Sequence, residues 1–487
     1  MEKGVALSIW PIDFWHWLAL CQRELLLFAG VFFLLGALDD IAVDAIFLWQ
    51  KLRGKTLTQK RDRAILARQP LQHPAAVFLP AWSEAEVIGD TLRHMLDSWA
   101  QPGLRVYAGC YQNDPETIAA VIAAARSDPR LRLVIHPCNG PTTKADCLNR
   151  LYRALGEDER RCGQDFGMVV FHDAEDVVDP AALGLLAEAI GKGADFVQLP
   201  VEPLVQRDHS WLRNQLGSHY CEEFAEAHGK AMAVRDALGA AIPGAGVGCA
   251  VARAMLHRLA ASHRDGQPFS SDSLTEDYEL GLAVGEHGGV SRFVRARGQD
   301  GALIATRAYF PARLDHVVGQ KTRWVHGISL QAWDRVGWGA GWAERWMRAR
   351  DRRGPFAGLV LMTGYVLIAL TAFGGVAVLA GAIEPQPLGL PLKVLLIANL
   401  AAFVWRGAWR FAFTARIYGW AEGIRAVLRI PLANVIAIMA GRRAVMAYIA
   451  SLRGNALVWN KTPHVRYPQA VAAYDNPALP LRAVPSR

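Results

Sequence analysis

The sequence predicts an α/β domain of the GT-A type, with transmembrane helices on both sides of it, and three observations lead to this prediction. Hydrophobic residues make up 52% of the 487 residues and the mean hydropathy is +0.12, both high for a soluble enzyme. Apolar runs long enough to cross a membrane lie near both ends. Between them, short apolar runs alternate with helical patterns, as in a largely parallel sheet covered on both faces.

The first apolar run, residues 25–49, predicts a membrane span. Seven basic residues follow within twenty positions: Lys51, Arg53, Lys55, Lys60, Arg61, Arg63 and Arg68. The positive-inside rule therefore places residue 50 onward in the cytoplasm and the N-terminus outside. The Trp-rich stretch at 9–22 is short, and it predicts an interfacial helix instead of a second span.

The second apolar region predicts two further spans. Five arginines between 345 and 353 precede the run at 356–383, so this run enters from the cytoplasm. The link at 384–391 carries no Lys or Arg and suits the outer side, and the run at 389–413 returns. The run at 430–440 has about eleven residues before Arg442, which predicts an interfacial or re-entrant helix. Three spans and a cytoplasmic C-terminus result.

Residues 73–335 read as the soluble α/β domain. Strand-like runs recur at 75–82, 104–111, 131–137, 167–174 and 195–202, and 115–126 is a clear helical pattern. Ligands of parallel sheets bind beyond the carboxyl ends of the strands. Glu84 follows the first run, Asp114 follows the second and Asp173 lies at the end of the fourth, so we expect these side chains to share one edge of the sheet.

Charge and cysteine content exclude several classes of protein. The formal charge is +8, but Lys and Arg cluster beside the apolar runs, which indicates contact with anionic lipid and not with nucleic acid. The seven cysteines are scattered, and no CxxC pair occurs. They predict free thiols in a reducing compartment, not a disulfide framework or a zinc site. We see no cleavable signal peptide.

Three carboxylates end the run at 167–174: Asp173, Glu175 and Asp176. Such a cluster is costly to bury unless a cation lies within it. Magnesium favours carboxylates combined with phosphate oxygens, so one interpretation is a metal site for Mg²⁺ or Mn²⁺ beside a diphosphate. The other interpretation is a solvated strand end without a ligand.

Thr275, Glu276 and Asp277 precede an apolar pattern that predicts a helix. Thr or Asp at a helix start is first of all a cap. A carboxylate here also suits a base, because a hydroxyl that attacks a sugar carbon loses its proton late and needs only a modest base. Asp277, with Glu276 beside it, is the candidate catalytic pair.

Gln320, Arg323 and Trp324 have the spacing that brings them near one face of a helix. Arg can hold a diphosphate through paired hydrogen bonds, and Trp offers a flat apolar surface for a sugar ring. The alternative interpretation is an amphipathic helix at the membrane surface, where Trp and Arg are common.

In this order and with these separations, the three groups resemble the processive family-two glycosyltransferases, which include cellulose, hyaluronan and chitin synthases. Pro80 to Glu84 is similar to the family's P-x-x-x-E, and Lys144 in TKADCLN to its K-x-x-x-L-N. The segment 244–248, with Gly246 at its centre, is similar to a glycine turn that precedes a helix on the acceptor side. The resemblance covers about residues 75–330.

The resemblance implies roles for individual residues. On the nucleotide-sugar side it implies the set Pro80, Glu84, Asp114, Lys144 and Asp173. On the acceptor and diphosphate side it implies Gly246, Gln320, Arg323 and Trp324. Two departures stand out: the loop at 111–115 replaces the usual Asp-Asp-Gly-Ser, and Glu175 replaces the second Asp of Asp-x-Asp, which leaves Glu175 or Asp176 as the second metal ligand.

Several stretches resemble the bacteriophage adsorption protein B subgroup, inner-membrane glycosyltransferases named for a phage receptor system. These are NDPET, HDAEDVVDP, EEFAEAHGK, PGAGVG and the late group Trp459, Lys461, Thr462 and His464. The subgroup implies synthesis of an exported surface glycan, with N-acetylmannosamine as a suspected unit. Its members often carry a C-terminal domain that binds cyclic di-GMP, and we expect none in these 487 residues.

The expected function is inverting transfer of a sugar, an N-acetylated hexose, from a UDP-sugar to a growing exported polysaccharide at the bacterial inner membrane. Expected partners are the UDP-sugar, a glycan acceptor, the lipid bilayer and an outer-membrane or periplasmic export protein, without nucleic acid. Two alternatives stay open: a single glycosylation of a lipid carrier, or an inactive scaffold of an envelope complex.

The expected division of the chain follows these patterns. An interfacial helix and the first span take residues 1–50, a basic cytoplasmic linker 51–72, and the glycosyltransferase domain 73–335. An interfacial helix at 336–355 leads into two spans and a further interfacial helix at 356–462, and 463–487 form a tail.

Overall fold

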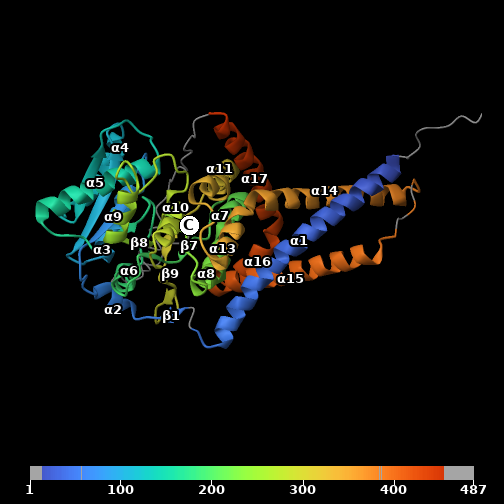
Figure 1. The fold of residues 1–487 in the computed structure, drawn as a ribbon, viewed down its shortest axis with the longest axis horizontal. Helices are drawn as coiled ribbons and strands as arrows, with labels where there is room; N and C mark the ends of the chain where they lie inside the picture. Colours follow the sequence, from blue (N-terminus) through green and yellow to red (C-terminus); the bar gives the residue numbers. More distant parts are fainter. Residues whose placement is uncertain (1–13, 56–57, 383, 385–386, 455–487) are drawn as a thin grey trace, which may run out of the picture.

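A seven-stranded mixed sheet forms the centre of the α/β domain in the computed structural model, which describes residues 14–55, 58–382, 384 and 387–454 (Figure 1). The strand order is β4-β3-β2-β5-β8-β6-β9. The strands are β2 (Ala75–Pro80), β3 (Leu104–Tyr111), β4 (Leu131–His136), β5 (Met168–Phe171), β6 (Phe196–Gln198), β8 (Cys249–Ala252) and β9 (Ser291–Phe293). Strands β2 to β5 are parallel to one another, whereas β8 runs antiparallel to both β5 and β6.

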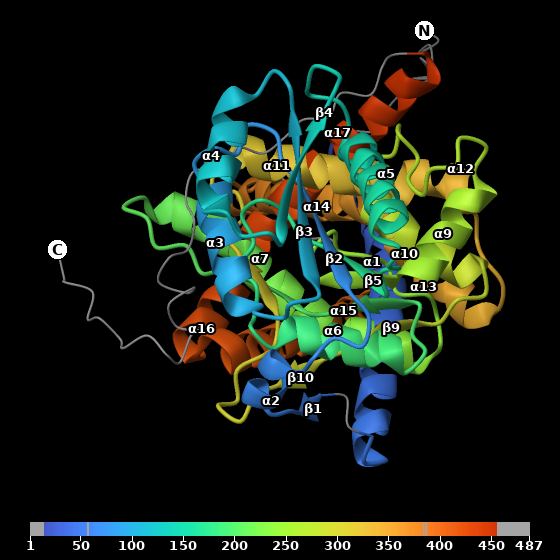
Figure 2. The same ribbon diagram turned by 90° about the vertical axis from the view of Figure 1, so that its left-hand side faces the viewer.

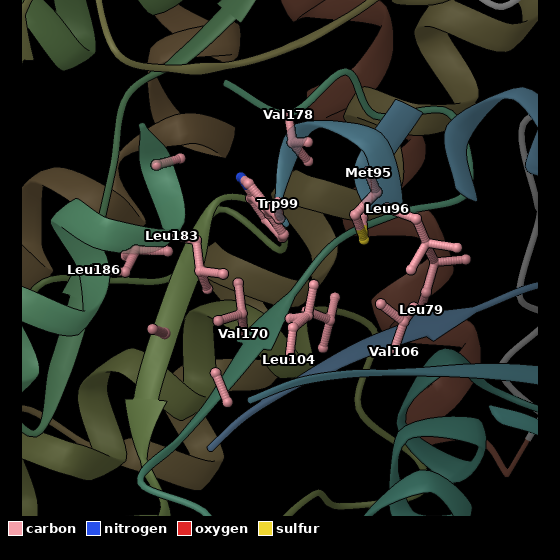
Figure 3. Close-up of a cluster of buried hydrophobic side chains, with 14 of the residues drawn as sticks. Leu79, Met95, Leu96, Trp99, Leu104, Val106, Val170, Val178, Leu183 and Leu186 are labelled. Atoms are coloured by element: carbon pink, nitrogen blue, oxygen red, sulfur yellow. The ribbon is translucent and has the colours of Figure 1, made fainter. Parts of the chain in front are cut away.

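Side chains of successive strand residues enter two different cores, as the alternation of a pleated strand requires. In β2, Val77 and Leu79 join one buried cluster, and Phe78 joins the other. The first cluster includes Trp99, which packs near Val178 and Leu183 (Figure 3) and whose indole nitrogen donates to the Asp179 carbonyl at 3.0 Å. Because both faces are buried, the strands read as continuous apolar runs.

Helices cover both faces of the sheet (Figure 2). On the face that carries Trp99 lie α2 (Arg63–Arg68), α3 (Ile88–Ser98), α4 (Pro115–Ala125) and α6 (Ala182–Gly191). On the other face lie α5 (Lys144–Cys162), α9 (Arg253–Ser262) and α10 (Glu276–Glu286). This arrangement confirms the expected α/β class with a largely parallel sheet.

The apolar run at 195–202, expected as one strand, is two strands. β6 ends at Gln198, and β7 (Val201–Pro203) pairs instead with β11 (Thr306–Ala308) in a small separate sheet. Pro200 lies at the break, and a proline has no N–H to give to a central ladder. A second small sheet pairs β1 (Gln59–Lys60) with β10 (Ala296–Arg297), so the expected linker at 51–72 contains β1 and α2.

Four helices in the described ranges are long and apolar enough to cross a membrane: α1 (Phe14–Leu52), α14 (Gly354–Leu379), α15 (Leu390–Tyr418) and α17 (Ile430–Leu452). α1 packs against α14 and α15, and the three extend together away from the sheet (Figure 1). α1 is continuous over 39 residues. The part of the expected interfacial helix that the structure describes therefore belongs to the same helix as the first span.

The run at 430–440, expected to be too short to span a membrane, belongs to a longer helix: α17 continues through Arg442 and Arg443 to Leu452 and has 23 residues. Its course differs from that of the other three. α17 packs against α14 and α11 (Leu314–Trp324) and runs across the other long helices close to the sheet domain (Figure 1).

Shorter helices join the sheet domain to the long ones. They are α7 (Trp211–Glu226), α8 (Met232–Ala237), α12 (Ala332–Val336), α13 (Trp342–Arg352) and α16 (Trp420–Leu428), together with two π-helices, η1 (Ala227–Ala231) and η2 (Val325–Gln331). Each π-helix continues an α-helix without a break, η1 after α7 and η2 after α11. Such segments are frequent at functional sites.

Acidic residues of α1 form ion pairs with basic residues from other parts of the chain. Asp40 contacts Arg406 of α15 as well as Arg350 and Arg353, whereas Asp44 contacts Lys230 of η1 at 2.5 Å. Arg406 of α15 thus reaches an acid of α1. Arg410 bonds Glu222 of α7 instead, at 3.1 Å.

Candidate active site

The candidate site is a pocket beyond the carboxyl ends of β2 and β5, closed on its other sides by the starts of α5 and α10 and by one face of α11. Twelve of the thirteen candidate residues line it. They are Pro80, Glu84, Lys144, Asp173, Glu175, Asp176, Gly246, Glu276, Asp277, Gln320, Arg323 and Trp324. Motifs up to 244 positions apart in the sequence thus meet in one cavity.

Lys144 lies among the carboxylates of the pocket. It is the first residue of α5, whose N-terminus is capped by Thr143. Its ammonium lies 2.5 Å from Asp173 Oδ1 and 3.9 Å from Glu276 Oε1. Burial opposes a charge on Lys144, but the carboxylates of Asp173, Glu276 and Asp277 outweigh it and raise the pKa, so the ammonium stays protonated.

Glu276 and Asp277 form the first turn of α10. Burial raises the pKa of Asp277 while Lys144 opposes that shift, and burial together with the neighbouring Asp277 raises the pKa of Glu276 to about 7. Thr275 occupies the N-cap position, yet its side chain makes no capping bond. Its buried hydroxyl oxygen has no hydrogen-bond partner in the described parts of the chain. The capping explanation of this motif therefore does not hold for Thr275.

A glycine turn packs directly against Asp277. Gly246 has φ +78°, and a Cβ atom there would lie 2.6 Å from Asp277 Oδ2 and 3.4 Å from Lys144 Nζ. Gln198 at the end of β6 fixes the turn, because its amide accepts from Ala245 N at 2.8 Å and donates to the Val247 carbonyl at 2.9 Å. The turn leads into strand β8, not into a helix as expected; α9 follows only after that strand.

The three acidic residues after β5 differ in their surroundings. Asp173 and Glu175 are partly exposed in the pocket, whereas Asp176 is 2% exposed. Asp176 Oδ2 lies 2.8 Å from His172 Nδ1 and accepts from Asp173 N at 3.0 Å. Asp176 therefore fixes the backbone of this loop.

Two of these carboxylates are the residues that would hold a divalent ion. In the described residues, no three His, Cys, Asp or Glu side chains converge closely enough to hold a metal ion alone. Mg²⁺ at a diphosphate typically uses one or two carboxylates, phosphate oxygens and water. Asp173 and Glu175 match that smaller requirement, and the buried Asp176 does not.

The helix α11 presents the Gln320, Arg323 and Trp324 face to the pocket. Tyr220 of α7 donates its hydroxyl hydrogen to Gln320 Oε1 at 2.7 Å. The Trp324 ring packs edge-on against Tyr220, with centroids 6.0 Å apart, and Phe224 and Phe310 complete an aromatic wall. Arg323 is close enough to Asp277 to lower the pKa of that carboxyl, against the larger effect of burial.

Asp114 is the one candidate residue that does not line the pocket. It caps α4, where its carboxylate accepts from Thr117 N at 3.3 Å and from Ser83 N at 2.6 Å. Through Ser83 it holds the segment that places Trp82 and Glu84 at the pocket. The late group Trp459, Lys461, Thr462 and His464 lies outside the described residues.

Sequence reasoning missed several residues of the pocket. The aromatic wall contains Phe224 and Phe310, and the rim near β3 contains Tyr111, which stacks on His136 at 5.1 Å between centroids. Tyr220 and Phe224 lie one helical turn apart on α7, a spacing that is a weak signal by itself because core helices show it as well.

Comparison with known protein families gives a match over the sheet domain. The family model described as "Glycosyltransferase like family 2" matches residues 73–327, which is more than half of the chain. The match spans every candidate residue of the pocket. It agrees with the observed Rossmann-type sheet and with the expected GT-A class of domain.

Two curated relatives align along almost the whole chain. They are the Bacteriophage adsorption protein B of Escherichia coli K12 and the Bacteriophage N4 adsorption protein B of Escherichia coli O157:H7. Each is 30% identical over 93% of this chain. The chain spans 64% of the length of these relatives.

The solved structures that align with this chain include two transferases. The mannosyltransferase PcManGT from Pyrobaculum calidifontis, in complex with GDP-Man and Mn²⁺, is 15% identical with a TM-score of 0.47, and the alignment covers 82% of this chain and 98% of that one. Glucosyl-3-phosphoglycerate synthase from Mycobacterium tuberculosis, with Mn²⁺, UDP and phosphoglyceric acid, is 16% identical with a TM-score of 0.36, covering 58% and 88%.

Proposed function

Because this chain belongs to glycosyltransferase family 2, we propose that its pocket transfers a sugar from a UDP-sugar to a glycan acceptor with inversion at the anomeric carbon. The observation that carries the proposal is the position of Lys144 among Asp173, Glu276 and Asp277. A protonated lysine there suits a diphosphate on one side, and a carboxylate suits an attacking hydroxyl on the other.

Asp277 is the proposed base. The acceptor hydroxyl gives its proton to an Asp277 carboxylate oxygen while its own oxygen bonds to the anomeric carbon. The bond between that carbon and the UDP oxygen breaks, and the electron pair leaves with UDP. Glu276, whose pKa is about 7, stays partly protonated near neutral pH and limits the negative charge beside Asp277.

The leaving diphosphate is proposed to lie between Lys144 and Arg323, with Pro80 and Glu84 on the nucleotide-sugar side. A divalent ion, Mg²⁺ or Mn²⁺, held by Asp173 and Glu175 would offset charge that develops on the leaving diphosphate. Asp114 acts on this side only through the Ser83 segment that it holds.

The acceptor is proposed to lie against Gly246 and the aromatic wall of α7 and α11. Gln320 is oriented there by the Tyr220 hydroxyl, and Trp324 offers a flat apolar face to a sugar ring. Because a Cβ at Gly246 would meet Asp277, the glycine keeps the space in which an acceptor hydroxyl reaches the base.

The product is proposed to be an exported surface polysaccharide built from an N-acetylated hexose, with an export partner in the periplasm or outer membrane. The apolar helices α1, α14 and α15 support transfer beside a membrane. The names of the two relatives, bacteriophage adsorption proteins, support a product at the cell surface, where a phage adsorbs. The basic residues after α1 and before α14 support a catalytic domain on the cytoplasmic side of a bacterial inner membrane.

Donor binding tests the assigned roles. Calorimetry with UDP and Mg²⁺ on the detergent-solubilised protein should give binding that weakens at least about tenfold in Asp173→Ala and in EDTA, since a charge-assisted contact is lost in both. Asp165→Ala, a change at an exposed aspartate before β5, is the matched control and should bind as the wild type does. Unchanged UDP affinity in EDTA would remove the proposed metal site.

A further inference from the structure

A second pocket lies apart from the candidate active site, where β1 and β10 meet the last turn of α15. Its volume is about 430 Å³. It is lined by Thr58, Gln59, Lys60, Arg61, Asp62, Arg297, Gly298, Gln299, Gly301 and Arg416. Figure 2 shows β1, β10 and α2 together below the sheet, and none of these residues lines the first pocket.

Several basic side chains lie close to one another in this pocket. In the parallel pair of β1 and β10, Lys60 is the register partner of Arg297. Like charges placed directly opposite on neighbouring strands destabilise a sheet. Arg416 adds a third cation from the end of α15, and Arg61 a fourth.

The nearby carboxylates are engaged elsewhere. Arg61 pairs with Glu188, and Asp62 caps α2 through Ala64 N and Ile65 N while it also accepts from Gln299 Nε2 at 2.9 Å. Glu202, which acts electrostatically on Arg295 and Arg297, bonds Arg307 at 3.3 Å. In the described parts of the chain, Lys60, Arg297 and Arg416 form no ion pair.

Buried nitrogen atoms of this cluster lack acceptors. Arg297 Nε and Nη2 are buried without a hydrogen-bond partner in the described chain. Behind them Arg295 is 6% exposed, and its Nε is likewise without a partner, although Nη1 donates to Thr58. Burial, with Arg297 and Arg416 adding to it, lowers the pKa of Arg295 to about 10. Unpaired cations at such depth are costly, so this cluster favours an anionic ligand.

We propose that this pocket binds a phosphate group, held by Arg297 and Arg416 with Lys60 at the entrance. A guanidinium pair matches phosphate oxygens through paired hydrogen bonds, and the buried donors of Arg297 supply them. Arg416 belongs to the last turn of α15, a helix long and apolar enough to cross a membrane. The phosphate therefore comes either from the headgroup of an anionic phospholipid at the membrane surface or from a soluble phosphate ester.

Ligand binding to the whole detergent-solubilised protein tests this proposal and separates the two sources. Native mass spectrometry would compare phosphatidylglycerol with zwitterionic phosphatidylcholine, and calorimetry would measure inorganic pyrophosphate in EDTA, which weakens the metal-dependent site. The variants are Arg297→Gln and the exposed Arg416→Gln. Arg264→Gln, which removes an exposed charge on the sheet domain far along the chain from both strands, is the matched control.

We expect phosphatidylglycerol, or pyrophosphate, to bind the wild type and Arg264→Gln equally and each pocket variant about tenfold more weakly, as for one lost charge-assisted contact. Binding of the lipid alone assigns a headgroup site, and binding of pyrophosphate alone assigns a soluble ligand. Equal binding by wild type and both variants would overturn the proposal, as would absence of binding in both arms. Because Arg416 is exposed, its variant keeps the test valid if Arg297→Gln does not fold.

Discussion

Single residues decide whether the pocket can work, and Gly246 shows this most clearly. Its backbone has φ +78°, which disfavours any side chain, and a Cβ there would lie only 2.6 Å from Asp277 Oδ2. Replacing Gly246 by a residue with a side chain would therefore have two effects: it would strain the backbone, and it would displace the Asp277 carboxylate. A glycine whose replacement would only strain the backbone allows these two effects to be measured separately.

Gly239 is that control, because its φ is +71° and a Cβ there would meet nothing within 4 Å. We expect Gly239→Ala to lower the free energy of unfolding by about 1 kcal/mol, and Gly246→Ala to lower it by more, because that change also displaces Asp277. Only Gly246→Ala should also abolish sugar transfer, since it moves Asp277 away from Lys144. Thermal melting and a transfer assay on both variants check this. Equal activity of the two variants would show that the Gly246 contact with Asp277 is not needed.

The sequence predicted which residues would meet, but not how each would be engaged. Residue chemistry singled out Asp173, Asp277 and Arg323, and the family resemblance added Lys144. The sequence does not indicate which of the three acids Asp173, Glu175 and Asp176 is buried. Asp176 is buried against His172, a result that depends on how the loop after β5 folds back.

At the scale of elements, π-helix η1 positions a buried histidine against the small sheet. His228 is 6% exposed, and its Nδ1 accepts a hydrogen bond from Val201 N of β7 at 2.9 Å. Burial, with Arg295 adding to it, lowers the pKa of His228 from 6.5 to about 4. The ring is therefore neutral in the folded protein at pH values where the unfolded chain is protonated.

Stability should depend on pH for this reason. Below pH 6.5 the unfolded chain binds a proton that folded His228 does not, so the free energy of unfolding falls as the pH falls from 6.5 toward 4. The expected loss is about 1.4 kcal/mol for each pH unit. In His228→Asn, whose Oδ1 can accept the same bond, the melting temperature should fall less steeply over this range. An exposed control, His263→Asn, should keep the wild-type slope. Identical slopes in wild type and His228→Asn would contradict this.

Element boundaries were predictable where one local signal dominated. The runs at 75–82 and 104–111 became strands because both faces of the sheet are buried there. The run at 195–202 divided at Pro200, and the glycine turn preceded a strand, because the choice of partner strand is a long-range event. Arg442 and Arg443 led to the prediction of a short helix. In the structure α17 packs against α11 and α14 and continues past both arginines.

In the whole molecule, ion pairs connect the sheet domain with the apolar helices. Asp44 of α1 contacts Lys230 of η1, and Glu222 of α7 is fully buried between Arg410 and Arg429. Removing one partner of such a pair leaves a buried charge, at a cost of about 3–5 kcal/mol. These contacts keep the pocket and the apolar helices in one fixed arrangement, which suits transfer beside a membrane.

The orientation of that arrangement can be tested from outside the cell. In a chain whose exposed cysteines Cys21, Cys138 and Cys162 are serine, Leu388→Cys lies in the link between α14 and α15. We expect a membrane-impermeant thiol reagent to label it in intact cells and to leave Arg264→Cys, on the sheet domain, unlabelled until lysis. Labelling of Arg264→Cys in intact cells would place the catalytic domain outside.

The most direct test of the central claim is sugar transfer by Asp277→Asn. Membranes that contain the wild type are supplied with a panel of labelled UDP-sugars, and label incorporated into glycan is measured beside UDP affinity. We predict that the wild type uses one of these donors and that Asp277→Asn transfers at least about a hundredfold more slowly with UDP binding nearly unchanged, since only the base is lost. Transfer by Asp277→Asn at the wild-type rate would contradict the account.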